Sequence, residues 1–211
     1  MLKKKVTIIG SGPNSVNSLD IILKLILKRK IKNNISEIII CDERGLFGCG
    51  NTHNINLHPS IILNRIAGQI ALGSAPFIQF PNSLRKFDYN FMDWINFKFR
   101  RTKKLKYKLK STDWPPRYLF GEAHIDKFYD LISIYKKKTN IKIKLINTKI
   151  LEIKKIKKLY HLKTSENLSI KTDKILICTG VTKRFEVNNG LDIKLKKLLK
   201  NTKSKYISDF L

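Results

Sequence analysis

The first forty residues show two kinds of hydrophobic pattern. A short β-branched run over 5–9 leads through a glycine turn into apolar residues at helical spacing from about Asn14 to Lys30, with Asp20 and Lys24 on the polar side. A continuous apolar run from Glu37 to Cys41 is typical of a strand that is buried on both faces of a parallel sheet. Strand, helix and strand in this order predict a right-handed βαβ unit.

The rest of the chain predicts a long departure from this sheet and a return to it. Residues 43–82 are rich in Gly, Asn and Pro, and ordered loops of this length are usually functional. Residues 83–135 are expected to be mostly helical, and short strands follow between 141 and 171. Lys174–Cys178 predicts another buried strand, which ends at Thr179-Gly180.

The charge of the chain is strongly positive, at +27 with 43 Lys and Arg against 16 Asp and Glu. Nucleic-acid binding is one interpretation, but it requires the lysines to gather on one face. They are instead spread along the chain together with isoleucine and asparagine, and the densest run, 100–110, holds one aromatic residue. This favours a solvated basic surface that attracts polyanions at low salt.

Other composition signals narrow the class of protein. The three cysteines, Cys41, Cys49 and Cys178, have no paired spacing, which predicts a reduced, cytoplasmic protein. Lys24 and Lys28 interrupt the longest apolar stretch, so no membrane span is expected. His53 and His58 lack a supporting carboxylate or cysteine cluster, and we therefore expect no metal site.

The glycine turn is the strongest candidate for chemistry. Gly10 permits a sharp turn, Gly12 lets the backbone approach a pyrophosphate, and the helix dipole with its free N–H groups attracts the phosphates. Ser15 occupies the third position, where glycine or alanine is usual, but serine is small enough to keep helix and strand close. Alone, this pattern also fits a turn that binds no ligand.

An acidic residue at the end of the second predicted strand strengthens the dinucleotide interpretation. Asp42 is placed to accept hydrogen bonds from both ribose hydroxyls, and Glu43 is the alternative. Arg44 suggests the 2′-phosphate of NADP, but the neighbouring carboxylate would repel a phosphate. The pattern therefore favours an unphosphorylated ribose.

Several blocks in fixed order give a more specific resemblance. These are residues 6–15, 41–50, 63–67 (Leu-Asn-Arg-Ile-Ala), 91–94 (Phe-Met-Asp-Trp), 115–122 (Pro-Pro-Arg-Tyr-Leu-Phe-Gly-Glu) and 173–180. Over residues 4–182 the chain resembles the FAD/NAD(P)-binding domain family that includes FAD-dependent urate hydroxylases and amino-acid N-monooxygenases. The resemblance implies an α/β Rossmann-like domain over 1–182, with a helical excursion at 74–135 and a β-meander at 150–171.

The resemblance also implies roles for individual residues. The turn would surround the FAD pyrophosphate, Asp42 or Glu43 would hold the adenosine ribose, and Gly48-Cys49-Gly50 would approach the flavin. Asn64 and Arg117 match polar positions near the cofactor or substrate, and Thr179-Gly180 matches a strand end that passes close to FAD. The complete set of cofactor-binding candidates is Gly10, Ser11, Gly12, Pro13, Asn14, Ser15, Asp42, Glu43, Gly48, Cys49, Asn64, Arg117, Thr179 and Gly180.

The expected activity is that of a flavoprotein oxidoreductase of the monooxygenase type, with NAD(P)H as electron donor and a small-molecule substrate. No catalytic side chain is nominated. The chain departs from the family at Cys178, at Ala123-His124 and in having no second glycine motif, so 183–211 is expected to be a basic tail or the start of a second domain. Two alternatives follow: a truncated FAD-binding module, completed by a partner chain or inactive, and a basic nucleic-acid-associated protein.

Overall fold

Four parallel strands form the central sheet in the computed structural model, which describes residues 3–28, 34–72 and 90–180. The strands are β1 (Lys4–Ile9), β2 (Ile35–Asp42), β3 (Lys142–Asn147) and β7 (Lys174–Ile177), in the order β3-β2-β1-β7. The apolar run of β2 is buried on both faces, as its composition predicts. The chain divides into two units, Met1–Cys178 and Thr179–Leu211.

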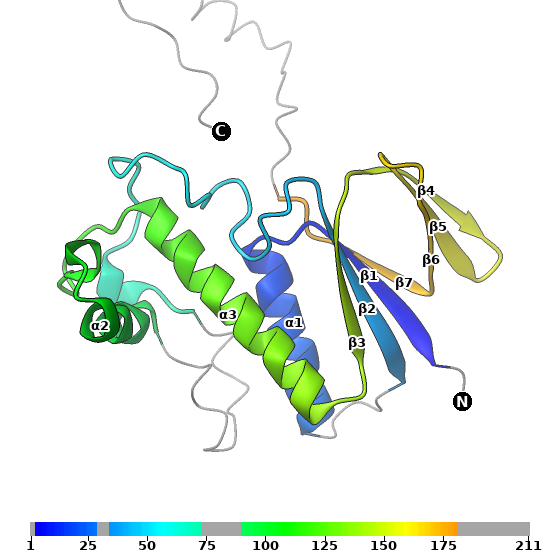
Figure 1. The fold of residues 1–211 in the computed structure, drawn as a ribbon, viewed down its shortest axis with the longest axis horizontal. Coiled ribbons are helices and arrows are strands. Elements are labelled where there is room, and N and C mark those ends of the chain that lie inside the picture. The colour runs from blue at the N-terminus through cyan, green and yellow to red at the C-terminus, as the bar shows by residue number, and fades with distance from the viewer. Residues whose placement is uncertain (1–2, 29–33, 73–89, 181–211) are drawn as a thin grey trace, which may run out of the picture. The chain divides into compact units, whose positions relative to one another are not determined.

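Two helices lie side by side on one face of this sheet, as Figure 1 shows. They are α1 (Pro13–Leu27) and α3 (Arg117–Lys138). Val16, Leu19 and Leu23 of α1 pack with Phe128 and Leu131 of α3 and with the inward side chains of β1 and β2. Each of these fully buried aliphatic or aromatic side chains contributes about 1.5–3 kcal/mol to stability.

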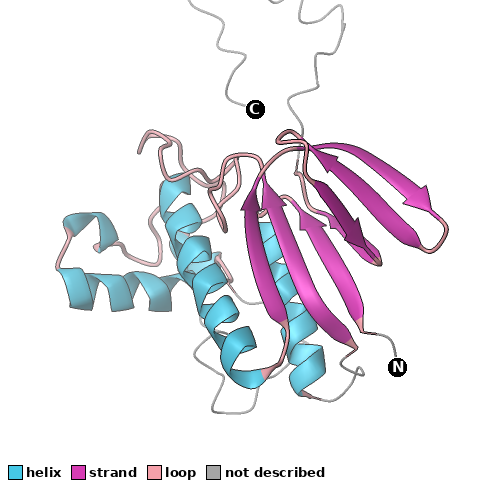
Figure 2. Ribbon diagram, turned by 45° about the vertical axis from the view of Figure 1, so that its right-hand side comes forward, coloured by secondary structure: helices cyan, strands magenta, loops and turns pink. Residues whose placement is uncertain are grey.

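A small antiparallel sheet covers the opposite face (Figure 2), so the first unit has three layers. It consists of β4 (Ile150–Ile156), β5 (Leu159–Thr164) and β6 (Ser169–Thr172). Leu162 and Ile170 pack against Ile9, Ile39 and Cys41. The predicted α/β fold with parallel sheet, flanking helices and antiparallel meander is therefore confirmed.

The excursion and the segment before it share a small core. It contains η1 (Ala67–Gln69), α2 (Phe91–Thr102) and η3 (Leu105–Tyr107), which pack on the first half of α3 around Trp94. Asn90 and Asp93 form a capping box at the start of α2, with the Asp93 N–H donating to Asn90 Oδ1 at 2.8 Å. Residues 103–116 are not helical apart from η3, because Lys103 adopts a left-handed conformation and Pro115-Pro116 disfavour a helix.

One expectation about α1 is wrong. Asp20 and Lys24, placed by periodicity on the polar side, are fully buried. Lys127 of α3 lies with its Nζ 2.7 Å from Asp20 Oδ2, and the Lys24 Nζ lies 3.4 Å from Asp20 Oδ1. A buried charge persists where an opposite charge faces it, and the partner here comes from a helix more than a hundred residues away.

Some predictions lie outside the described residues. They concern the end of the first helix at 29–30, the part of the excursion at 74–89, and the basic segment 183–211.

Candidate functional site

The candidate site lies at the carboxyl ends of β1 and β2. Gly10 follows β1 with φ +89°, a conformation that favours glycine, and its N–H donates to the Cys41 carbonyl at 2.8 Å. Helix α1 begins directly after Gly12, with Pro13 in its first turn and no side chain among the described residues capping it. The first turn of α1 therefore presents its N–H groups and the positive end of the helix dipole.

Gly12 has a backbone conformation that any residue adopts, with φ −70° and ψ −172°. A Cβ atom built at this position would lie 3.4 Å from Gly50 Cα, which is an ordinary contact distance. Gly50, by contrast, has φ +64°, and a Cβ there would lie 3.0 Å from Gly12 Cα. The fold therefore requires glycine at position 50 and does not require it at position 12.

The segment 45–50 is held between the glycine turn and α3. Gly48 has φ +109° and donates its N–H to the Ser11 carbonyl at 2.9 Å. A Cβ at Gly48 would lie 2.8 Å from Ile125 Cα. Cys49 is completely buried, and this burial raises the pKa of its thiol, so the reactive thiolate is disfavoured there.

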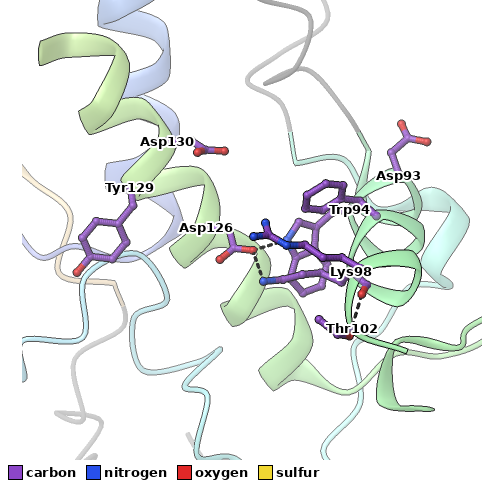
Figure 3. A pocket seen from close by; sticks show the side chains of 9 residues that line it. Asp93, Trp94, Lys98, Thr102, Asp126, Tyr129 and Asp130 are labelled. Carbon is purple, nitrogen blue, oxygen red and sulfur yellow. Dashed lines mark hydrogen bonds and ion pairs between the residues drawn. The ribbon is translucent and has the colours of Figure 1, made fainter. Parts of the chain in front are cut away.

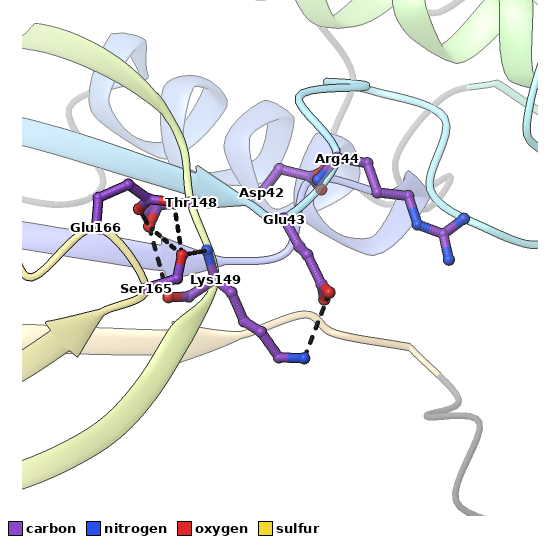
Figure 4. A network of polar contacts seen from close by, with 7 residues as sticks. All are labelled: Asp42, Glu43, Arg44, Thr148, Lys149, Ser165 and Glu166. Carbon is purple, nitrogen blue, oxygen red and sulfur yellow. Dashed lines mark hydrogen bonds and ion pairs between the residues drawn. The ribbon is translucent and has the colours of Figure 1, made fainter.

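The two neighbouring acids at the end of β2 have different partners, and Figure 4 shows the ion pair that Glu43 forms with Lys149. Asp42 Oδ2 accepts hydrogen bonds from the Ser11 Oγ at 2.5 Å and the Ser11 N–H at 3.0 Å. The exposed Glu43 carboxylate pairs instead with Lys149, 3.4 Å away. Asp42 is therefore the acid whose carboxylate lies against the glycine turn.

Inside the first turn of α1, Ser15 is fully buried and Asn14 is exposed. The Ser15 Oγ has no hydrogen-bond partner among the described residues. Serine at the third motif position thus keeps helix and strand close, as expected, and adds a buried polar atom.

Asn64 and Arg117 lie on two segments that run side by side. Ile62 and Pro116 form an antiparallel bridge, and the Leu63 N–H donates to the Pro115 carbonyl at 2.9 Å. Arg117 donates its Nε–H to the Ile62 carbonyl at 3.1 Å, while Asn64 is exposed. The structure thus brings the segment that carries Asn64 beside the start of α3, which carries Arg117, and the cofactor role of both residues stays a prediction.

Thr179 and Gly180 follow Cys178 directly in the chain and belong to the second unit. Gly180 has φ +70°, so glycine is favoured at this position by the backbone alone. Their predicted contact with the cofactor stays a prediction.

Sequence reasoning missed the contact between the loop after β2 and helix α3. A Cβ at Gly121 would overlap the carbonyl oxygen of His53. The Phe120 ring lies between the rings of His53 and His124, at centroid distances of 4.7 and 4.2 Å. Burial lowers the pKa of His53 to about 4 and that of His124 to about 3, so both rings are neutral packing groups. Gly121 belongs to the 115–122 block that contributes to the family resemblance, but the sequence assigned it no structural role.

A separate cavity of about 530 Å³ opens between α2 and α3 (Figure 3). Trp94 Nε1 donates to Asp126 Oδ2 at 2.9 Å, and the Lys98 Nζ lies 2.7 Å from the same oxygen. None of the predicted cofactor-binding residues lines this cavity.

Within 3–28, 34–72 and 90–180, no group of three or more His, Cys, Asp and Glu side chains is arranged to hold a metal ion. Over the same ranges, no helix has the length and apolar character needed to cross a bilayer.

The fold and the glycine turn define a Rossmann-type nucleotide-binding domain with a second, antiparallel sheet on one face. The chain belongs to the FAD-NAD(P)-binding family, whose sequence model matches residues 7–182. The resemblance found in the sequence is therefore confirmed. A comparison with curated protein sequences gives no match.

Solved structures that match this chain include monooxygenases at low identity. Lysine monooxygenase from Nocardia farcinica is 11% identical with a TM-score of 0.49, over 93% of this chain and 65% of that chain. For flavin-containing monooxygenase from Stenotrophomonas maltophilia the identity is 12%, the TM-score 0.47 and the coverage 85% and 39%. For cyclohexanone monooxygenase from Rhodococcus sp. Phi1 these values are 10%, 0.42, 86% and 27%. The chain thus spans less than two thirds of each of these proteins.

Proposed function

We propose that this chain binds FAD with its pyrophosphate on the first turn of α1. The observation that carries the proposal is Gly12, which lacks a side chain although the fold does not require glycine there. A glycine beside an uncapped helix N-terminus leaves the backbone open to close approach by a phosphate. The family match supports a cofactor of this class.

The neighbouring residues fit the rest of such a cofactor. Asp42 ends β2 beside the glycine turn, where a carboxylate holds an adenosine ribose. The segment 45–50 lies against the same turn through Gly48 and Gly50, and Ser15 adds a buried hydroxyl without a partner among the described residues. Pyrophosphate, ribose and the flavin side therefore each have a candidate group on this chain.

The reaction proposed is that of a monooxygenase-like flavoprotein oxidoreductase that takes electrons from NAD(P)H. The isoalloxazine of bound FAD supplies the redox chemistry, and the chain supplies binding and orientation. No described side chain is assigned as a catalytic residue. The substrate is proposed to be a small molecule.

Gly12→Ala tests the cofactor placement. We expect the variant to fold like the wild type, because the added Cβ has room, but to bind FAD at least tenfold more weakly, because the methyl group occupies the path of the pyrophosphate. Isothermal titration gives the affinity, and urea unfolding gives the stability. Gly10→Ala is the matched variant, and it should lose stability because of its positive φ.

Wild-type FAD affinity in Gly12→Ala would refute this placement. The enzymatic part is tested by flavin absorbance: bleaching on addition of NADPH supports an oxidoreductase, whereas flavin that is bound but not reduced supports a binding module. A folded wild-type protein that binds no FAD would contradict the proposal as a whole.

A further inference from the structure

Ser11 links three segments of the candidate site. It is fully buried, and its Oγ–H and its N–H both donate to Oδ2 of Asp42, at 2.5 and 3.0 Å. Its carbonyl accepts the Gly48 N–H at 2.9 Å. One residue thus connects the glycine turn to the end of β2 and to the glycine-rich segment 45–50.

These bonds change what Ser11 offers to a ligand. Its amide hydrogen is already donated to Asp42, so it is not available to a phosphate in the way expected for the second residue of a glycine turn. Its hydroxyl hydrogen also points to Asp42, because that bond is much shorter than the 3.4 Å from Oγ to the Leu46 carbonyl. Both donors of Ser11 therefore serve the carboxylate.

The carboxylate of Asp42 retains limited capacity. An ionised carboxylate offers about four lone-pair sites, two on each oxygen. The two bonds from Ser11 fill Oδ2, and the Arg44 N–H takes one site on Oδ1 at 3.0 Å. One acceptor site on Oδ1 remains, and its direction is fixed by the other three bonds.

We propose that Ser11 is a positioning residue that fixes the Asp42 carboxylate so that Oδ1 accepts a hydrogen bond from a hydroxyl of the adenosine ribose. The inference rests on the proposed FAD site. It adds to that site a preference for an adenosine ribose with a free hydroxyl. A carboxylate held as an acceptor binds a free hydroxyl and repels a phosphate ester on the same ribose. Glu43 does not share this role, because it pairs with Lys149 (Figure 4).

The test compares two ligands and three proteins. The ligands are FAD and an FAD analogue whose adenosine ribose lacks the 2′- and 3′-hydroxyls. The proteins are the wild type, Ser11→Ala and Ser11→Cys, which keeps the shape of the side chain with a slightly larger atom and a weak donor. We expect both variants to bind FAD about tenfold more weakly, the scale of one hydrogen bond to a charged group, and to bind the analogue as the wild type does.

Each outcome decides between roles. Equal loss for both ligands would show that Ser11 only stabilises the turn, and an unchanged affinity for FAD would show that it does not position Asp42; either result overturns the inference. Circular dichroism verifies folding, and if Ser11→Ala does not fold, Ser11→Cys alone carries the comparison. Wild-type protein that binds neither ligand would instead overturn the proposed FAD site and the inference with it.

Discussion

The two glycines of the turn, Gly10 and Gly12, differ in backbone conformation, although the sequence does not distinguish them. Gly10 has a positive φ and is needed by the backbone, whereas Gly12 is in an extended conformation with room for a side chain. The sequence pattern treats both as one motif. Only the φ angle and the distance to Gly50 separate the glycine that the backbone needs from the glycine at which a Cβ atom would fit.

His53 and His124 predict a specific pH dependence of stability. Burial lowers their pKa values to about 4 and about 3, whereas an unfolded histidine has a pKa of about 6.5. The unfolded state therefore binds more protons than the folded state below about pH 6.5, and stability should fall as the pH is lowered from 6.5 towards 4. With two such groups, the expected slope approaches about 2.7 kcal/mol per pH unit.

Urea unfolding between pH 7 and 5 measures this slope. His53→Phe keeps an aromatic ring against Phe120, and it loses no hydrogen bond of Nδ1 among the described residues. Because one of the two titrating groups is removed, the slope of unfolding free energy against pH should fall by about half. The exposed-loop variant His58→Gln serves as the control. A free energy of unfolding that stays constant over this range would contradict the assignment of neutral, buried rings.

At the scale of elements, the continuous apolar runs were the most informative part of the sequence. They predicted β2 and β7 as buried parallel strands, because strands covered on both faces lack polar alternation. Both strands are parallel members of the sheet, and β2 is buried. The predicted burial is wrong for β7, because this strand lies at the edge of the sheet and Ile177 is exposed. Helical periodicity, by contrast, wrongly placed Asp20 and Lys24 of α1 on the polar side of the helix. Their burial depends on Lys127, which α3 brings to them, and local pattern carries no information about a partner so distant in sequence.

Gly121→Ala tests the contact between α3 and the loop after β2. The new methyl group would overlap the His53 carbonyl, so the loop has to move away from the helix. Overpacking of this kind costs about 1–3 kcal/mol, and we expect that loss of unfolding free energy in urea. FAD affinity should also fall, because Gly48 and Cys49 of the same loop lie against Ile125 and Gly121.

Gly12→Ala is the matched glycine substitution, because it adds the same methyl group at a position where the Cβ atom makes only an ordinary contact with Gly50. It should cost about 1 kcal/mol or less, because Gly12 is the N-cap of α1, where alanine is less favourable than glycine. Equal stability of the wild type and Gly121→Ala would show that the loop is not held by α3.

At the scale of the molecule, the order of blocks along the chain predicted the fold better than any single block. The glycine turn, the strand-end acid, the excursion and the meander each allow several folds, but their succession leads to the three layers observed in the first unit. The site was predicted less completely. The hydrogen bonds of Ser11 and the packing of Gly121 depend on tertiary contacts that no local pattern encodes.

The charge of +27 belongs to the whole chain. Some described lysines are matched by acids, as Lys5 and Lys144 are by Glu37, whose pKa they lower. The basic residues are spread along the whole sequence, and a field without a focus binds polyanions without sequence preference. We therefore expect a short DNA duplex to bind at about 20 mM salt and to be released by about 200 mM, as counterion release requires.

Two charge reversals distinguish this field from a dedicated interface. Arg100→Glu with Arg101→Glu changes the end of α2, and Lys157→Glu with Lys158→Glu changes the exposed β4–β5 turn, so both pairs remove the same charge from distant places. A diffuse field predicts similar losses of DNA affinity for the two pairs, measured by fluorescence anisotropy, and unchanged binding of FAD. Loss confined to one pair, or binding that survives high salt, would indicate a nucleic-acid interface on that element and would favour that function over a purely electrostatic attraction.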